Sequence, residues 1–269
     1  MLAGLAPARR RLLLVLLALV VAAAVAATGL LLAGRGEDAA PAAPVSQEEP
    51  GPVLLVPGYG GGTGSLTSLG DRLTAEGRDA TVVTLPGDGT GDLAAAADAL
   101  GEAVDAALAR TGAGSVDVVG YSAGGVVARL WAADGGAGVA RRVVTLGSPH
   151  HGTTLADLAL TLAPGQCPDA CRQLATDSEL LAALNAGDET PDGPTWVSIW
   201  TAQDETVTPP ESARLDGALG LAVQSVCSGA QVGHGDLPRD PLVQAMVLAE
   251  LAPGDPVPLG PADCARLGG

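Results

Sequence analysis

The sequence predicts a doubly wound α/β fold with a mostly parallel sheet and a short helical cap. Short apolar runs, rich in valine and leucine, alternate with longer segments of helical period between residues 52 and 251. These runs lack the strict polar alternation of a half-buried strand, so we expect strands buried on both faces and joined by right-handed crossovers. About forty residues between 151 and 194 interrupt the alternation and exceed an ordinary connection. We therefore expect a cap over about residues 152–193.

Each expected element has its own signal. The helix expected from residue 92 to 110 has the clearest period, with one apolar face formed by Leu93, Leu100, Val104 and Leu108. The apolar runs predict strands at 53–56, 80–85, 115–121, 141–148, 195–201 and 221–227. The segments between them predict further helices at 65–77, 123–133, 155–162, 178–186 and 241–251. The order of strands and helices therefore accounts for one domain over residues 52–252.

The N-terminus has the features of an export element. Three arginines, Arg9 to Arg11, precede an uncharged stretch of 21 residues at 12–32. Its length favours a retained membrane anchor, because a spanning helix needs about 20 residues. Ala24-Val25-Ala26 instead offers the small-residue site of a cleaved signal peptide, and both interpretations stay open. In either case the chain after residue 36 is expected outside the cytoplasm, secreted or anchored to the outer face of the membrane.

Composition separates the remaining segments. Residues 37–51 are rich in proline, alanine and acid without any period, which predicts a flexible linker before the domain. After residue 36 the chain has 10 of its 14 arginines and all 30 acidic residues, so its net charge is 10 − 30 = −20. Such a charge repels phosphate backbones and excludes nucleic acid as an expected partner. We expect a monomer whose partner is a small-molecule or lipid substrate.

The four cysteines indicate disulfides rather than a metal. An even number of cysteines in an exported chain is typical of disulfide bonds, here with three possible pairings. We favour Cys167 with Cys171, because CPDAC is a local loop, and Cys227 with Cys264, which flank the last helix and would tie the tail 253–269 to the domain. Zinc is disfavoured, since no second close pair and no adjacent histidine complete a ligand set. We expect no metal and no cofactor.

A serine between glycines marks the end of the third expected strand. In Gly120-Tyr121-Ser122-Ala123-Gly124 the strand stops and a helix begins. A serine on such a sharp turn exposes its hydroxyl beyond the carboxyl ends of the strands, where ligands bind in open α/β sheets. A turn that merely needs small residues is the alternative. In this context the pattern favours a nucleophile.

A serine nucleophile needs a base and a group that orients the base. Among the three histidines, His234 follows the last strand, and in the order serine, acid, histidine it occupies the last position. Asp204 directly follows the strand 195–201 and is the preferred acid, with Glu205 and Asp216 as alternatives. These three side chains, Ser122, Asp204 and His234, are the candidate catalytic triad.

Two backbone amides are candidates for an oxyanion hole. One is the amide of Ala123, directly after the serine, and the other is the amide of Tyr59 in the glycine-rich loop PGYGGGTG. The loop lacks the G-K-[ST] of a phosphate-binding loop and the rest of a dinucleotide fingerprint. A phosphate site is therefore the weaker interpretation.

The motifs together resemble those of bacterial secreted triacylglycerol lipases and esterases of the α/β-hydrolase superfamily. The resemblance covers most of residues 52–251 and rests on VLLVPGYGGG, VDVVGYSAGGVVARLW, VVTLGSPHHGT, VSIWTAQDETVTPPESARLDGA and VGHGDL. It is most similar to the small Bacillus-type lipases, and it implies a triad of Ser122, Asp204 and His234 with the Tyr59 and Ala123 amides as oxyanion hole. His150 and His151 resemble a P-H-[HKR]-G segment that lines or supports the site in larger lipases, and a capped strand end is the alternative.

The sequence departs from this family at three places. Pro57-Gly58 stands where a His-Gly pair is common, Tyr121-Ser122-Ala123-Gly124 stands for H-S-M-G, and the CPDAC cap has no counterpart in the smallest lipases. We expect a serine hydrolase that cleaves carboxylic esters, most plausibly lipid esters, through an acyl-enzyme. The alternatives are a cell-envelope acyltransferase with the same triad and a non-catalytic binding module of the same fold.

Overall fold

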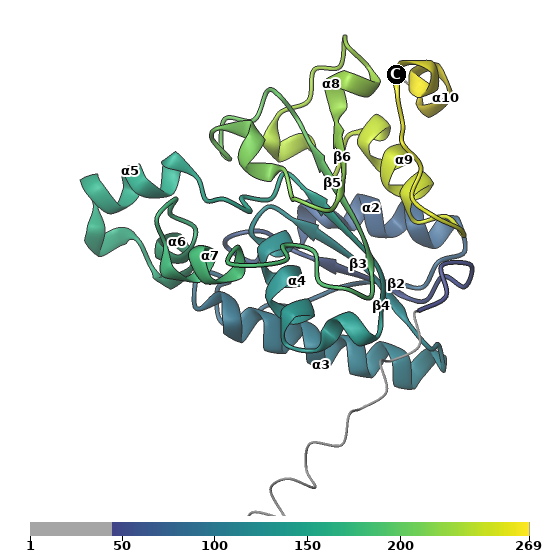
Figure 1. Cartoon of the computed structure of the whole chain (residues 1–269), viewed down its shortest axis with the longest axis horizontal. Coiled ribbons are helices and arrows are strands. Elements are labelled where there is room, and N and C mark those ends of the chain that lie inside the picture. The colour runs from purple at the N-terminus through teal and green to yellow at the C-terminus, as the bar shows by residue number, and fades with distance from the viewer. Residues whose placement is uncertain (1–44, 269) are drawn as a thin grey trace, which may run out of the picture. The chain divides into compact units, whose positions relative to one another are not determined.

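Six parallel strands form a single sheet in the order β2-β1-β3-β4-β5-β6. The computed structural model describes residues 45–268, and Figure 1 shows helices on both faces of this sheet. The strands are β1 (Val53–Val56), β2 (Ala80–Val82), β3 (Val116–Tyr121), β4 (Ala140–Leu146), β5 (Thr195–Trp200) and β6 (Leu219–Ala222). The longer helices are α2 (Gly64–Ala75), α3 (Leu93–Thr111), α4 (Ala123–Ala133), α5 (Thr154–Leu162) and α9 (Pro241–Glu250), and the shorter ones are α6 (Asp169–Gln173), α7 (Glu179–Leu184), α8 (Val223–Val226) and α10 (Cys264–Leu267). The predicted doubly wound α/β class is confirmed.

Two apolar cores hold the helices against the sheet. Alternate residues of β1 point to opposite faces, so Leu54 packs with α3 and α4, whereas Leu55 packs with α2 and α9. The central strands are buried on both faces, which explains why apolar residues predominate in them. This three-layer arrangement fixes the carboxyl ends of β3, β4 and β5 side by side, where the candidate site residues follow.

The last strand differs from its prediction. The run 221–227 was expected to be one strand, but β6 ends at Ala222 and the next four residues form the helical turn α8. Leu219 and Leu221 of β6 pair with β5, whereas Val223 and Val226 are the buried residues of the helical turn. A short apolar run does not by itself distinguish a strand from a buried helical turn.

Three helices, α5, α6 and α7, interrupt the alternation after β4, in the region expected to form a cap (Figure 1). A disulfide joins Cys167 to Cys171 within this region, and a second joins Cys227 to Cys264. Both pairings are those favoured from the sequence.

The expected export element at 1–36 and the first part of the expected linker lie outside the described residues. Within residues 45–268, no helix combines the length and the apolar character needed to cross a membrane. Gln47, in the segment expected to be a linker, is bonded to the domain: its side-chain amide donates to Arg141 O (3.1 Å) and its Oε1 accepts from Arg142 (2.9 Å). Composition alone did not indicate these contacts.

The amino ends of the strands contain a buried ionic cluster. Asp117 on β3 accepts two hydrogen bonds from Arg141 on β4 (2.8 and 2.7 Å) and one from Arg78 (2.5 Å). Both Asp117 and Arg141 are fully buried, so each charge depends on the other for compensation. This cluster lies at the edge of the sheet opposite the candidate site.

Glu250, at the end of α9, is a buried acid that forms no ion pair with another of the described residues. Its side chain is fully buried, Oε2 accepts from the Val257 amide (3.1 Å), and Oε1 has no partner among the described residues. Burial raises the pKa of Glu250 to about 7, although the Val257 amide and the Arg142 charge act in the opposite direction.

A raised pKa makes the stability of the domain depend on pH through Glu250. Glu250 keeps its proton up to about pH 7 in the folded state but loses it near pH 4.5 in the unfolded chain. Its contribution to the free energy of unfolding is therefore complete below pH 4.5 and is lost as the pH rises to about 7. One unit of pKa shift corresponds to about 1.4 kcal/mol. Between pH 5 and pH 8 the free energy of unfolding of Glu250→Gln is therefore expected to rise relative to that of wild type by up to about 3 kcal/mol. Urea unfolding at the two pH values measures this difference. The exposed Glu102→Gln is the control and should follow wild type. Equal behaviour of the two variants would contradict the prediction.

Candidate active site

Ser122 occupies a strained turn between β3 and α4. Its backbone has φ 54° and ψ −126°, and it is the only residue other than glycine with positive φ in the described part of the chain. Such a conformation costs on the order of 1–3 kcal/mol and persists only where the surroundings impose it. The turn places the Ser122 hydroxyl at the carboxyl end of the sheet, as the sequence predicted.

The glycines on either side of Ser122 allow this turn. A Cβ on Gly124 would lie 2.3 Å from Val56 O, and a Cβ on Gly120 would lie 2.5 Å from Gly124 O. Both distances are far shorter than a real contact, so strand β3, its turn and the first turn of α4 approach each other only because both positions lack a side chain. The Gly-x-Ser-x-Gly spacing therefore has a packing cause in this structure.

The three candidate triad residues lie within hydrogen-bond distance of one another. His234 Nε2 is 3.0 Å from Ser122 Oγ, and His234 Nδ1 is 2.7 Å from Asp204 Oδ2. The residues come from three different places: the β3–α4 turn, the loop after β5, and the short helical turn His234–Asp236 before α9. All three are nearly buried, so their contacts are protected from water. The three candidate residues thus have the mutual geometry that a nucleophile, its base and an orienting acid need for acyl transfer.

Asp204 is held as a hydrogen-bond acceptor by its own loop. Its Oδ1 accepts from the Thr206 amide (2.9 Å) and the Val207 amide (2.7 Å), which leaves Oδ2 for His234. The alternative acids are elsewhere: Glu205 is exposed, and the exposed Asp216 bonds through its backbone to the segment at Glu189 and Thr190.

Two residues that were not singled out from the sequence also shape this site. The Tyr121 hydroxyl donates to His234 O (3.3 Å), and the two rings lie 5.3 Å apart. Burial, with the nearby Asp204 charge as a second cause, raises the pKa of Tyr121 to about 12, so the phenol stays neutral. Gly147 has φ 54°, and a Cβ there would lie 2.5 Å from Leu237 and 3.3 Å from His234 Nδ1. Tyr121 and Gly147 both lie inside sequence motifs that resemble those of lipases, but their roles depend on contacts between distant parts of the fold.

The two candidate oxyanion-hole amides are free to bind a ligand. Neither the Ala123 amide nor the Tyr59 amide donates a hydrogen bond to another of the described residues. Ala123 is the first residue of α4, so its amide also benefits from the positive end of the helix. Tyr59 and Ser122 line the same pocket.

That pocket has a volume of about 260 Å³ and opens at the Ser122 hydroxyl. Its lining contains no charged side chain, and much of it is contributed by the cap. The lining residues are Tyr59, Ser122, Pro149, Thr153, Leu155, Ala156, Ala159, Gln166, Cys171, Leu174, Thr206 and Val207. The arrangement favours an uncharged, largely apolar group next to the serine.

His150 and His151 are not among the residues that line this pocket. His150 is fully buried with Nε2 3.1 Å from Thr145 Oγ1, and burial, followed by the Arg129 charge, holds its pKa well below the ordinary value. His151 lies at the surface, where its Nε2 contacts Glu189 (2.9 Å) and its Nδ1 lies 3.3 Å from Ser212 O. A role of either residue in supporting the site stays a prediction.

No metal site accompanies this geometry. Among residues 45–268, no group of three or more histidine, cysteine, aspartate or glutamate side chains is placed to hold a metal ion.

Comparison with known proteins identifies the fold. A family model described as alpha/beta hydrolase fold matches residues 51–167, less than half of the chain. Aspergillus fumigatus lipase B has a TM-score of 0.65 and 19% identity over 80% of this chain and 56% of its own. Mature Bacillus licheniformis lipase BlEst2 has a TM-score of 0.63 and 22% identity over 80% of this chain and 95% of its own. No curated protein sequence matches the chain.

These findings confirm the resemblance at the level of the fold. The chain has the α/β-hydrolase fold, with the serine turn after the third strand where that fold has its nucleophile. It spans a little over half the length of the Aspergillus lipase that it matches.

Proposed function

We propose that this protein is a serine hydrolase that cleaves carboxylic esters, chiefly lipid esters, through an acyl-enzyme intermediate. The observation that supports the proposal most strongly is the continuous pair of hydrogen bonds from Ser122 Oγ through His234 to Asp204. The two solved structures reported above are both described as lipases, which agrees with an ester substrate.

The proposed mechanism follows from the roles of the three side chains. Ser122 Oγ attacks the ester carbonyl carbon while His234 Nε2 takes its proton, and Asp204 stabilises the imidazolium that results. The amides of Tyr59 and Ala123 donate to the oxyanion of the tetrahedral intermediate. His234 then protonates the departing alcohol, which leaves the acyl group on Ser122. His234 next takes a proton from water as the water oxygen attacks the acyl carbon. It then returns this proton to Ser122 Oγ as the bond between Oγ and the acyl carbon breaks, which releases the carboxylic acid and restores the free serine.

The pocket supports an apolar acyl group as part of the substrate. Leu155, Ala156, Leu174 and Val207 contribute apolar walls beside the Ser122 hydroxyl, and the lining offers no cation to bind a free carboxylate. Each methylene of the substrate that is buried in such a pocket contributes about 0.8 kcal/mol of favourable transfer free energy.

We place the activity outside the cytoplasm. The two disulfides support this, because such bonds persist in oxidising compartments and are rare in the cytosol.

Labelling with a fluorophosphonate tests the proposed nucleophile. Wild type is expected to form one phosphonyl adduct per chain at Ser122, because the adjacent imidazole removes the hydroxyl proton and the two amides donate hydrogen bonds to the phosphonyl oxygen. Ser122→Ala is expected to form none. Intact-protein mass spectrometry followed by peptide mapping measures both. An unmodified wild-type serine would favour a non-catalytic binding module instead, and ester products with an added alcohol would identify an acyltransferase.

A further inference from the structure

One wall of the Ser122 pocket comes from the cap and contains half of a disulfide. Ala159 on α5, Gln166 in the following loop and Cys171 on α6 all line the pocket. Cys171 is bonded to Cys167, so the disulfide closes the loop between the two helices at the pocket itself. The second disulfide, Cys227 to Cys264, does not contribute to this lining.

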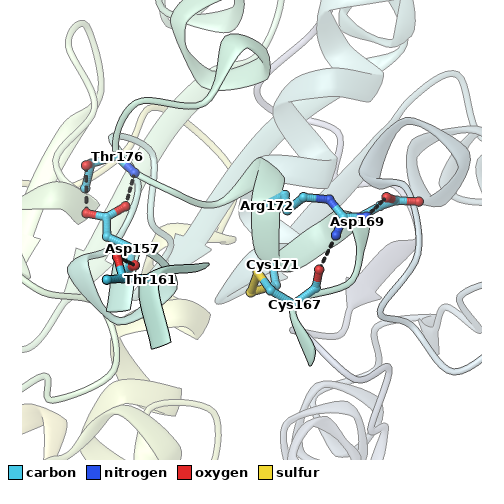
Figure 2. The surroundings of a disulfide bond; sticks show 7 residues. All are labelled: Asp157, Thr161, Cys167, Asp169, Cys171, Arg172 and Thr176. Carbon is cyan, nitrogen blue, oxygen red and sulfur yellow. Dashed lines mark hydrogen bonds and ion pairs between the residues drawn. A yellow bond between two sulfur atoms is a disulfide. The ribbon is translucent and has the colours of Figure 1, made fainter. Parts of the chain in front are cut away.

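Helix α6 is anchored to the body of the domain. Gln173 contacts the start of α3 twice: its Oε1 accepts from the Leu93 amide (2.8 Å) and its Nε2 donates to Asp92 (2.7 Å). The Ala170 amide donates to Thr90 O (3.1 Å), and Ala170 is fully buried. The first turn of α5 is anchored as well, because Asp157 accepts from both the amide and the hydroxyl of Thr176 (2.9 and 2.8 Å; Figure 2).

Residues 158–168, which we call the flap, lie between these two anchors. In the described part of the chain, the hydrogen bonds of the flap remain within it, within α5 or with α6, where Arg172 donates to Cys167 O. Leu160 packs against the core, but Leu158 and Leu162 are 52% and 73% exposed. Besides the peptide chain itself, the Cys167–Cys171 bond, shown in Figure 2 beside Arg172, and the hydrogen bonds at Cys167 O and Pro168 O hold the far end of the flap to the anchored α6.

An apolar surface continues past the pocket along α5. Leu155 lines the pocket, and Leu158 and Leu162 follow it three and seven positions later, on the same side of the helix. The pocket volume of about 260 Å³ lies below the roughly 300–1,000 Å³ of ordinary ligand pockets, so a long acyl chain would extend beyond the pocket towards this surface.

We propose that the Cys167–Cys171 disulfide is a specificity-determining element: by holding the flap on α6 it keeps the pocket short and selects esters of short and medium acyl chains. This inference rests on the proposed ester hydrolysis. Breaking the disulfide frees the far end of the flap from α6, so the pocket can lengthen between Ala159 and Gln166 on the flap and Cys171 on α6, and longer chains fit while the triad stays in place.

The test compares kcat/KM on p-nitrophenyl esters from acetate to palmitate for the full chain and two double variants. In C167A/C171A the ratio of kcat/KM on palmitate to that on butyrate is expected to rise about tenfold, the scale on which apolar pockets discriminate methylenes. In C227A/C264A, the matched loss of a disulfide outside the pocket, the ratio is expected to stay within about twofold of wild type. Equal ratios in all three proteins would overturn the inference.

Reduction of the folded protein covers the case in which C167A/C171A does not fold. In the C227A/C264A background only the pocket disulfide remains, and tris(2-carboxyethyl)phosphine reduces it to two thiols as the phosphine becomes its oxide. The same rise in the palmitate to butyrate ratio is expected once thiol titration gives two thiols per chain, and it should reverse on reoxidation. An unchanged ratio with both thiols present would overturn the inference while ester hydrolysis stands. If wild type forms the fluorophosphonate adduct at Ser122 but hydrolyses no ester of the series, both this inference and the proposed ester hydrolysis are overturned.

Discussion

His234→Ala is expected to lower kcat for p-nitrophenyl butyrate by on the order of 10⁶-fold, to the level of Ser122→Ala. The Ser122 hydroxyl has one neighbouring base, His234 Nε2 at 3.0 Å, and without it the proton has no acceptor when the oxygen attacks. Because serine and histidine act as one unit, the double variant is expected to lose no more than either single variant. Steady-state kinetics with enzyme concentrations corrected for folded protein measures the effect.

His151→Ala is the control for this experiment. Its imidazole is outside the pocket and contacts Glu189 on the surface, so kcat should stay within about twofold of wild type. Loss of activity in His151→Ala with retention in His234→Ala would reverse the assignment of the base. His150 is unsuited as a control, because removal of its fully buried ring would leave a cavity and lower stability.

Asp204→Asn is expected to lower kcat by about 10⁴-fold without unfolding the protein. The Thr206 and Val207 amides donate to Oδ1, so an asparagine at this position keeps its oxygen there and turns its NH₂ group towards His234. A donor facing Nδ1 favours the tautomer with the proton on Nε2, and that nitrogen then cannot accept the serine proton. KM should change much less than kcat, since Asp204 does not line the pocket.

Glu205→Gln provides the matched control one residue along the same loop. Glu205 is exposed and makes no contact with His234, so its kcat is expected to equal that of wild type. A large loss in Glu205→Gln together with an active Asp204→Asn would show that the other carboxylate orients the base. Thermal unfolding of both variants separates loss of catalysis from loss of the fold.

The order of strands and helices was predictable because the central strands are buried on both faces. Their apolar runs stand out from the amphipathic helices, as in α3, whose expected bounds of 92–110 differ by one residue at each end from the structure. The last strand is an exception. Of the expected strand 221–227, only residues 221–222 belong to β6 and the next four form the helical turn α8, which a short apolar run does not distinguish from a strand.

The candidate site was predictable where local motifs determine chain direction. Ser122 follows β3, Asp204 follows β5 and His234 precedes α9, and a parallel sheet brings such positions to one edge. Tyr121 and Gly147 were missed because their importance comes from distances to His234 and Leu237, which no local pattern contains. His150 and His151 share a motif but occupy a buried core position and the surface, and the motif could not distinguish the two.

The amino-acid sequence by itself determined the α/β class, the serine turn and the Cys167–Cys171 pair, because each depends on residues that are near in the chain or on a repeated burial pattern. The Cys227–Cys264 pair was favoured from the sequence, but it joins positions 37 residues apart that only the fold brings together. The tertiary structure alone decided which side chains meet: the hydrogen bonds from Asp204 to His234 and from His234 to Ser122 join residues 30 and 112 positions apart. The same holds for the cap, where the anchoring of α6 by Gln173 joins positions 80 residues apart. Contacts of this kind arise from packing of the whole sheet and its helices, so their distances are properties of the folded chain and not of any segment.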